Sequence, residues 1–114
     1  MTFPTRAFKI LTGAQLAELM GAGNFAGAPV DLEDGYIHLS SEGQLGETLV
    51  KHFTGQGDLW VVEVDLIALH DLVRWEPSRG GQLFPHIYGE LPLSAVVAHG
   101  PVLWGDDGKV MLPH

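Results

Sequence analysis

Leu59-Trp60-Val61-Val62-Glu63-Val64 is a segment dense in β-branched and aromatic residues. Those residue types fit a pleated surface, and a run with so few polar positions is typical of a strand inside a sheet. We therefore expect residues 59–64 to form the central, mostly buried strand of the domain.

A helix is predicted before this strand, over residues 41–55. Ser41 followed three positions later by Gln44 has the spacing of a capping box, in which side chains satisfy free backbone N–H groups of the first turn. Apolar residues then recur at every fourth position, namely Leu45, Leu49 and Phe53. This spacing places them on one face of a helix.

The other expected elements are shorter. Upstream we expect a strand over residues 7–11, a helix over 13–20 capped by Thr12, a loop over 21–34 and a strand over 36–40. Downstream we expect a helical turn over 65–72, a strand over 73–75, a turn over 92–95 and a strand from 96 toward 103. A tight turn at 106–108 predicts a terminal hairpin of residues 102–104 and 109–112.

This order of elements predicts an α+β fold, with two main helices packed on a small, split sheet that is antiparallel or mixed. Two helices are too few to flank a doubly wound sheet of this length. The glycine-rich Gly21-Ala22-Gly23 does not fit a dinucleotide fingerprint, because it follows a helix and the fingerprint follows a strand.

Composition sets limits on the class of protein. The 114 residues suffice for one domain, residues 1–114, with one core. A formal net charge of −8 disfavours broad nucleic-acid binding. The absence of cysteine excludes disulfides and Cys-ligated zinc and fits a reducing cytoplasm. The sequence shows neither a signal peptide nor an apolar run of about 20 residues, so we expect a cytoplasmic protein without a membrane segment.

The segment from Arg74 to Gly89 has no helix or strand period, yet it holds two arginines, a glutamate, a histidine and a tyrosine. Two prolines and a Gly-Gly pair break regular structure, while interleaved aromatic and aliphatic residues supply apolar anchors. We interpret the segment as an ordered functional loop. Two guanidinium groups beside an imidazole and a phenol suit an anionic ligand, in particular one that carries phosphate.

Each polar residue of this segment has two interpretations. Arg74 and Arg79 can bind a phosphate or form structural ion pairs with nearby acids. Glu76 lies between two apolar residues, a setting that favours a raised carboxyl pKa and a role as acid or base, or it holds Arg79 in place. His86 and Tyr88 alternate, so in an extended chain they share one side and can clamp a base or sugar, or they bond loop carbonyls in a packed corner.

A second candidate group lies on the strand predicted over residues 36–40. Tyr36, His38 and Ser40 share one face of it. His38 can hydrogen-bond a ribose hydroxyl or a phosphate, or a carbonyl in the core; the Ser40 and Ser41 hydroxyls can bind the ligand or cap the next helix. We expect this segment and residues 74–89 to form the two walls of a cleft.

Metal and serine chemistry find little support. The sequence has no HExxH motif, its six histidines are scattered, and no metal site is expected. A site built from His38, His86 and a carboxylate remains an alternative. No G-x-S-x-G elbow is present, which disfavours a serine hydrolase.

The motifs Asp34-Gly35-Tyr36-Ile37-His38-Leu39-Ser40, Arg74-Trp75-Glu76-Pro77 and Phe84-Pro85-His86-Ile87-Tyr88-Gly89 resemble those of a small bacterial family, domain of unknown function 952. The resemblance covers nearly the whole chain. It implies a minimal ADP-ribosyltransferase-like fold, a split sheet enclosing an NAD-binding cleft, in which a histidine on an early strand contacts the nicotinamide-side ribose. His38 matches that histidine.

The resemblance also marks departures. The His38 segment is similar to a His-Val-His-Leu-Ser segment of the RNA 2′-phosphotransferase branch, with Tyr36 in place of the first histidine. For the catalytic glutamate of toxin-like members, Glu76 and Glu90 are both candidates.

Three functions follow in order of preference. The first is a binder of NAD or a related phosphorylated nucleotide, with NAD as a substrate of a transferase-like enzyme. Its catalytic residues are His38 and Glu76, and its ligand-binding residues are Tyr36, Ser40, Ser41, Arg74, Arg79, His86 and Tyr88. The second is an interaction module, which an exposed apolar patch around Trp75, Phe84 and Trp104 would favour. The third is a metal-assisted hydrolase.

Overall fold

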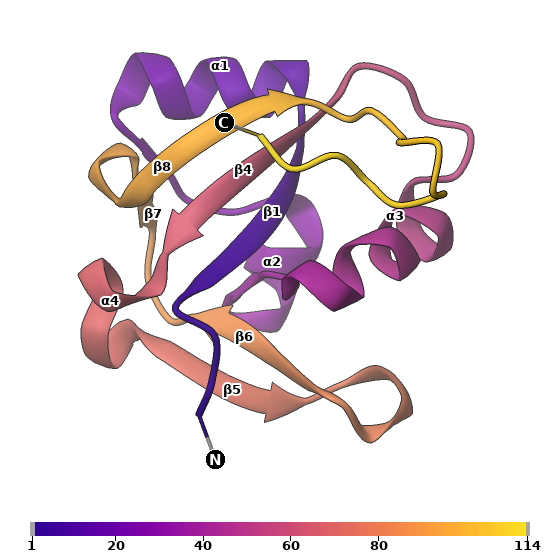
Figure 1. Ribbon diagram of the computed structural model, residues 1–114. Helices are drawn as coiled ribbons and strands as arrows, with labels where there is room; N and C mark the ends of the chain where they lie inside the picture. Colours follow the sequence, from indigo (N-terminus) through magenta and orange to yellow (C-terminus); the bar gives the residue numbers. More distant parts are fainter. Residues whose placement is uncertain (1, 114) are drawn as a thin grey trace.

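The computed structural model describes residues 2–113, apart from the side chain of Arg79. It is an α+β domain in which every described strand pair is antiparallel (Figure 1). The two longest helices are α1 (Gly13–Ala22) and α3 (Leu45–Phe53). The prediction of an α+β fold with antiparallel sheets and a few helices is therefore confirmed. None of the described helices is long and apolar enough to cross a membrane.

The first sheet has the strand order β1-β4-β8, formed by Arg6–Thr12, Leu59–Asp65 and Val96–Pro101. β4 is the middle strand, as its composition predicts, and it pairs with β1 along its full length. Five consecutive residues of β1, 7–11, are buried, because this strand is covered on both faces. One of those five is Lys9.

The second sheet has the order β3-β6-β5, formed by Ile37–His38, Leu83–Ile87 and Val73–Pro77. It corrects the prediction of a loop over residues 74–89. Most of that segment is the antiparallel hairpin β5–β6, closed by the short turn η3 (Arg79–Gly81).

Pro85 explains why the sequence predicted no strand there. Proline cannot donate to a ladder and is rare inside sheets. In β6 it pairs with Trp75 on one side, and on the other its carbonyl accepts the N–H of Leu39, just beyond the end of the two-residue β3.

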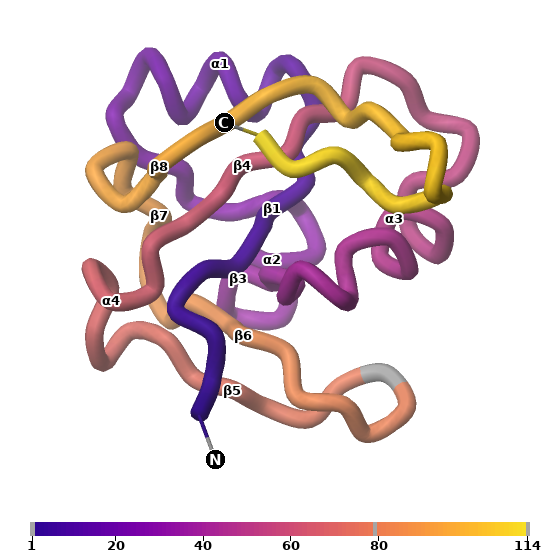
Figure 2. Tube along the Cα trace, viewed as in Figure 1, coloured from indigo at the N-terminus to yellow at the C-terminus, as the bar shows by residue number. Residues whose placement is uncertain are grey.

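One backbone bridge links the two sheets. Phe8 and Ser40 exchange N–H···O hydrogen bonds of 2.8 Å each, which ties β1 to the segment that follows β3. The strand predicted over 36–40 is thus reduced to β3 and this bridge. In Figures 1 and 2 the β5–β6 hairpin lies apart from the first sheet, below it in the view.

Capping signals fix the helix ends. The Thr12 side chain accepts the N–H of Gln15, whose side chain accepts the N–H of Thr12, and α1 stops at Gly23 in the left-handed conformation. Leu16 and Leu19 of this helix are buried, whereas Met20 is exposed.

Residues 21–34, predicted as a loop, contain the helix α2 (Pro29–Asp34) and the strand β2 (Asn24–Phe25), which pairs with β7 (Leu91–Pro92). Helix α2 begins with proline at its first position, and the Asp31 side chain accepts the N–H of Ala28 there at 2.8 Å. It ends at Gly35, which has the left-handed conformation. The helix is too short to show an apolar period, which is why the sequence did not reveal it.

The remaining short elements agree with the sequence more closely. The predicted helical turn is α4 (Leu66–Leu69) followed by η2 (His70–Leu72), and α3 is preceded by η1 (Glu42–Gln44). The turn before β8 is η4 (Leu93–Ala95). The predicted terminal hairpin is reduced to a bridge between Trp104 and Val110.

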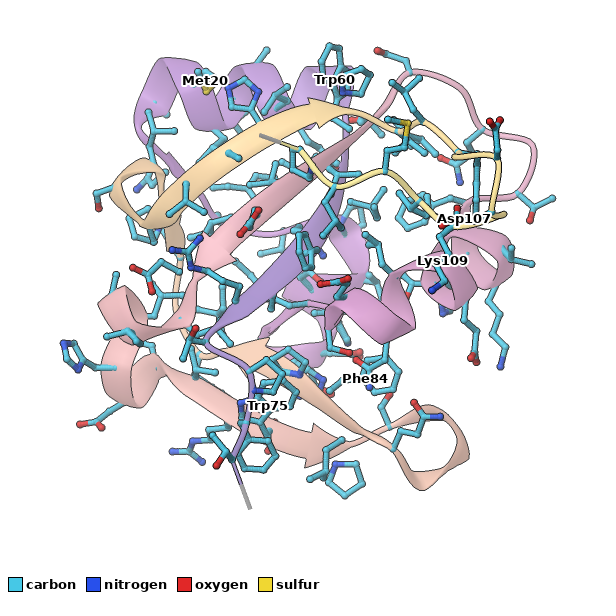
Figure 3. The ribbon with its side chains drawn as sticks, viewed as in Figure 1. Met20, Trp60, Trp75, Phe84, Asp107 and Lys109 are labelled. Carbon is cyan, nitrogen blue, oxygen red and sulfur yellow. The ribbon has the colours of Figure 1, made fainter. Side chains whose placement is uncertain are left out.

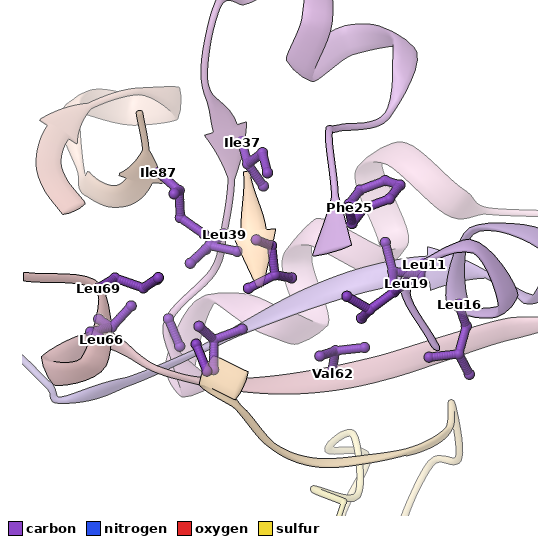
Figure 4. Packing of buried hydrophobic residues seen from close by; sticks show 14 residues of the cluster. Leu11, Leu16, Leu19, Phe25, Ile37, Leu39, Val62, Leu66, Leu69 and Ile87 are labelled. Atoms are coloured by element: carbon purple, nitrogen blue, oxygen red, sulfur yellow. The ribbon is translucent and has the colours of Figure 1, made fainter. Parts of the chain in front are cut away.

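Two hydrophobic clusters flank the first sheet. The larger contains Leu11, Leu19 and Val62 together with Ile37 and Ile87 of the second sheet (Figure 4). The smaller lies beneath α3 and comprises Phe8, Ile10, Leu45, Leu49 and Val61. The fourfold spacing that predicted α3 thus marks the face that packs on the sheet.

Candidate functional site

One face of the second sheet gathers polar and aromatic side chains. Its register pairs Ile37 with Ile87, and His38 with His86. Successive strand residues point to opposite faces, so the isoleucines enter the core while their even-numbered neighbours lie on the other side. The group defined here as the strand cluster consists of Tyr36, His38, Arg74, Glu76, His86 and Tyr88.

Glu76 is the hydrogen-bond acceptor of the strand cluster. Its Oε1 accepts the Nδ1–H of His86 and the hydroxyl of Tyr88, both at 2.8 Å. The hydrogen bond from His86, and after it the one from Tyr88, lower the pKa of Glu76. The expected rise of this pKa is therefore wrong, because the side chain is 33 % exposed and well partnered. Glu76 is a fixed anion at neutral pH.

His86 lies beneath Tyr36. The residue is 2 % exposed, and its ring stacks on the tyrosine ring with centroids 4.1 Å apart. Burial lowers the pKa of His86, and the hydrogen bond to Glu76 opposes this only in part. The ring is therefore a neutral imidazole with its proton on Nδ1. Its buried Nε2 is an acceptor for which the described residues provide no donor.

A tyrosine titration tests the Glu76 contacts. The hydrogen bond to Glu76 is the main cause of the raised pKa of Tyr88. The chain has two tyrosines, so Tyr36→Phe leaves Tyr88 alone. Adding Glu76→Gln to this variant should lower the tyrosine pKa, followed by the ultraviolet absorbance of tyrosinate. An unchanged pKa would contradict the contact; Glu33→Gln serves as the charge-matched control.

His38 has a carboxylate on each side of its ring. Nδ1 lies 2.7 Å from Oδ1 of Asp31, and Nε2 lies 2.9 Å from Oδ2 of Asp34. The backbone N–H of His38 also donates to Asp31, at 3.1 Å. A carboxylate oxygen can only accept, so both ring contacts are hydrogen bonds at once only when both ring nitrogens carry a proton.

Asp31 anchors this network from inside the protein. The carboxylate is buried, and Lys9 Nζ lies 2.9 Å from its Oδ2, while Ala28 supplies a backbone N–H. Burial alone would raise the pKa of Asp31, but the hydrogen bond from His38 and the charge and hydrogen bond of Lys9 outweigh it and lower the pKa to about 2. Burial lowers the pKa of Lys9, opposed by Asp31.

Lys9 and Asp31 were not predicted as site residues from the sequence. Their positions differ by 22 residues, and nothing local marks them as partners. One signal was available. Lys9 interrupts an apolar strand, and a lysine buried there requires an anion.

Arg74 completes the strand cluster at its exposed side. The guanidinium carbon lies 4.8 Å from the ring centroid of Tyr88, a cation–π contact. Arg74 forms no salt bridge with any residue that the structure describes. Its N–H groups are thus available to a ligand. The Arg79 side chain, predicted to act beside it, lies outside the described residues.

Ser40 and Ser41 form hydrogen bonds with residues outside the strand cluster. The Ser40 hydroxyl hydrogen-bonds that of Thr48 at 2.7 Å, and the Ser41 N–H donates to Gln44 at 3.0 Å. Ser41 lines a separate hollow of about 450 Å³ that also contains Arg6.

The two predicted walls of a cleft form one surface instead, because β3 and β6 are neighbours in the same sheet. A hollow of about 490 Å³ exists elsewhere, lined by residues of α3, β4 and the C-terminal segment that include Phe53, Trp60 and Trp104. Figure 3 shows Trp60 and the hairpin residue Trp75 at opposite ends of the molecule. The hollow is therefore separate from the candidate site.

The patch expected of an interaction module is not continuous. Phe84 is buried, and Trp75 is partly covered by Phe3, whose ring stacks on it at 4.7 Å, whereas Trp104 lies beside α3. Within residues 2–113, no three His, Asp or Glu side chains are grouped in a way that could hold a metal ion.

The chain matches a family model described as a protein of unknown function (DUF952) over residues 10–99. Among solved structures, it is similar to the crystal structure of protein CC0527 from Caulobacter crescentus, a structural genomics target, with 40 % identity, a TM-score of 0.85 and 95 % of each chain covered. The solution structure of the same protein gives 40 % identity and a TM-score of 0.78, covering 93 % of this chain and 91 % of that one. No curated protein matches.

Proposed function

The chain belongs to the DUF952 family, and we propose that it binds NAD or a related phosphorylated nucleotide on the strand cluster. One observation carries this proposal. Two tyrosine rings, an ionised glutamate and an arginine that forms no salt bridge within the described residues lie together on or beside neighbouring strands at the surface.

Each part of such a ligand has a complementary group. Tyr36 and Tyr88 are tilted neighbours with centroids 5.3 Å apart, and their partly exposed rings suit a planar base. Arg74 suits a phosphate, because a guanidinium donates in a bidentate fork. His38 would donate to a ribose or phosphate oxygen through Nε2, in place of its contact with Asp34.

NAD adds a feature that the charges favour. Its nicotinamide ring is cationic, and the strand cluster offers aromatic faces beside the anion of Glu76. This combination also supports a transferase on the ADP-ribosyltransferase-like frame that the motifs imply. The bond from ribose to nicotinamide would break with its electron pair on nicotinamide, an acceptor hydroxyl or amine would bond to the ribose carbon and lose its proton, and Glu76 would stabilise the positive charge.

Calorimetric titration with NAD, ADP-ribose and adenosine tests the proposal. We expect the two phosphorylated ligands to bind and adenosine to bind more weakly, since it lacks the group that Arg74 recognises. No heat of binding up to millimolar ligand would overturn the proposal. Chromatography of the NAD sample distinguishes a transferase from a protein that only binds NAD, because a transferase releases nicotinamide and a binder does not.

A further inference from the structure

The two carboxylates on His38 differ in how firmly they are held. Asp31 is buried and accepts additional hydrogen bonds from Ala28 and Lys9. The side chain of Asp34 is 41 % exposed, and among the described residues it forms an ion pair only with His38. The Nδ1 contact is therefore fixed, and the Nε2 contact is replaceable.

Charge explains why another anion suits this position. Lys9 balances the charge of Asp31, and His38 balances that of Asp34 when both ring nitrogens donate, as the two carboxylate contacts require, so the four groups are then neutral together. If the Asp34 side chain moves away, the Nε2–H of the His38 cation loses its acceptor, while Nδ1 stays hydrogen-bonded to Asp31. A neutral hydroxyl restores only the hydrogen bond, whereas a phosphate oxygen restores both the hydrogen bond and the charge balance.

The backbone allows Asp34 to leave without disturbing the core. Asp34 is the last residue of α2, next to Gly35 in the left-handed conformation, with φ of 88°. Ion pairs of such exposure stabilise proteins little. Rotation of this one side chain uncovers Nε2, while Asp31 keeps the ring in place.

We propose that His38 Nε2 is an anion subsite for a ligand phosphate, and that Asp34 occupies this subsite in the free protein and is displaced on binding. The choice of phosphate rests on the proposed function. That Asp34 occupies the subsite in the free protein follows from the contacts of His38 alone. Asp34 thereby sets the affinity and selects anionic over neutral ligand groups.

The test is an NMR titration of the full chain with inorganic phosphate at fixed pH and ionic strength, following the His38 ring resonances. Asp34→Ala should bind phosphate roughly fivefold more tightly than the wild type, the size of a weak, exposed ion pair. Glu33→Ala removes the same charge from the same helix, and its affinity should stay within about twofold of the wild type.

A double variant, Asp34→Ala with His38→Gln, identifies the donor. Its phosphate affinity should fall back to that of the wild type, with folding checked by circular dichroism. A gain that persists in the double variant, or one that Glu33→Ala matches, would overturn the proposal by showing a general charge effect. If Asp34→Ala binds phosphate more tightly but the wild type binds no nucleotide, the subsite is retained and the nucleotide function is refuted. If the wild type binds nucleotide but Asp34→Ala gains no phosphate affinity, the nucleotide function is retained and the subsite is refuted.

Discussion

Asp31→Ala is expected to lower the free energy of unfolding by about 3–5 kcal/mol, a large part of the total for a domain of this size. The substitution leaves Lys9 as a buried, unpaired charge and removes the acceptor of the Ala28 and His38 N–H groups. Urea unfolding of the variant and the wild type measures the difference.

Two variants make this result specific to the buried pair. Glu33→Ala, on the exposed side of the same helix, should change the stability by less than about 0.5 kcal/mol. Asp31→Leu combined with Lys9→Met should recover part of the loss, because removing both charges is less costly than removing one. If Asp31→Ala costs no more than Glu33→Ala, Asp31 is not the anchor of the network.

The same carboxylate gives an acid dependence. The folded pKa of Asp31, about 2, lies below its ordinary value of 3.8. A depressed carboxyl pKa contributes stability above the unfolded pKa, and that contribution is lost as the pH falls from about 4 through about 2, here roughly 2 kcal/mol. In Asp31→Asn this part of the acid dependence should be absent.

Arg74→Ala is expected to weaken binding of ADP-ribose by about 10- to 100-fold, the range for loss of a charge-assisted hydrogen bond to phosphate. Adenosine binding should change far less. Arg74→Lys should keep part of the affinity, since lysine preserves the charge and loses the bidentate fork. Calorimetry with both ligands measures these differences.

Arg6→Ala is the matched control for Arg74. Arg6 is also an exposed arginine, but its guanidinium pairs with Glu63 at 2.9 Å and lines the separate hollow near Ser41. Its replacement should leave ADP-ribose affinity unchanged. Equal losses in Arg6→Ala and Arg74→Ala would indicate unspecific attraction of the anion and would remove Arg74 from the site.

Patterns that repeat along the chain predicted structure well. The apolar run of residues 59–64 predicted β4, and the fourfold spacing from Leu45 predicted α3. Alternation placed His86 with Tyr88, and Tyr36 with His38, and the structure brings all four rings together. These features depend on local geometry, which the sequence carries directly.

Features that depend on long-range contacts were missed. The ion pair of Lys9 with Asp31 joins β1 to α2, a helix too short to show a period. The hairpin β5–β6 was mistaken for a loop because Pro85 lacks an N–H and proline is rare inside sheets. The missing N–H is tolerated in β6 because Pro85 lies beside the end of the short strand β3. The interpretation of Glu76 as a carboxyl with a raised pKa was wrong because its partners lie across the sheet, His86 on β6 and Tyr88 just after it.

The most direct test of a nucleotide site on the strand cluster is NMR mapping of ADP-ribose on the wild-type protein. We predict that shifts concentrate on the ring resonances of Tyr36, His38, His86 and Tyr88, while the indole signals of Trp60 and Trp104 in the distant hollow stay in place. Shifts centred on those two tryptophans, or none at saturating ligand, would contradict a ligand site on the β3-β6-β5 sheet.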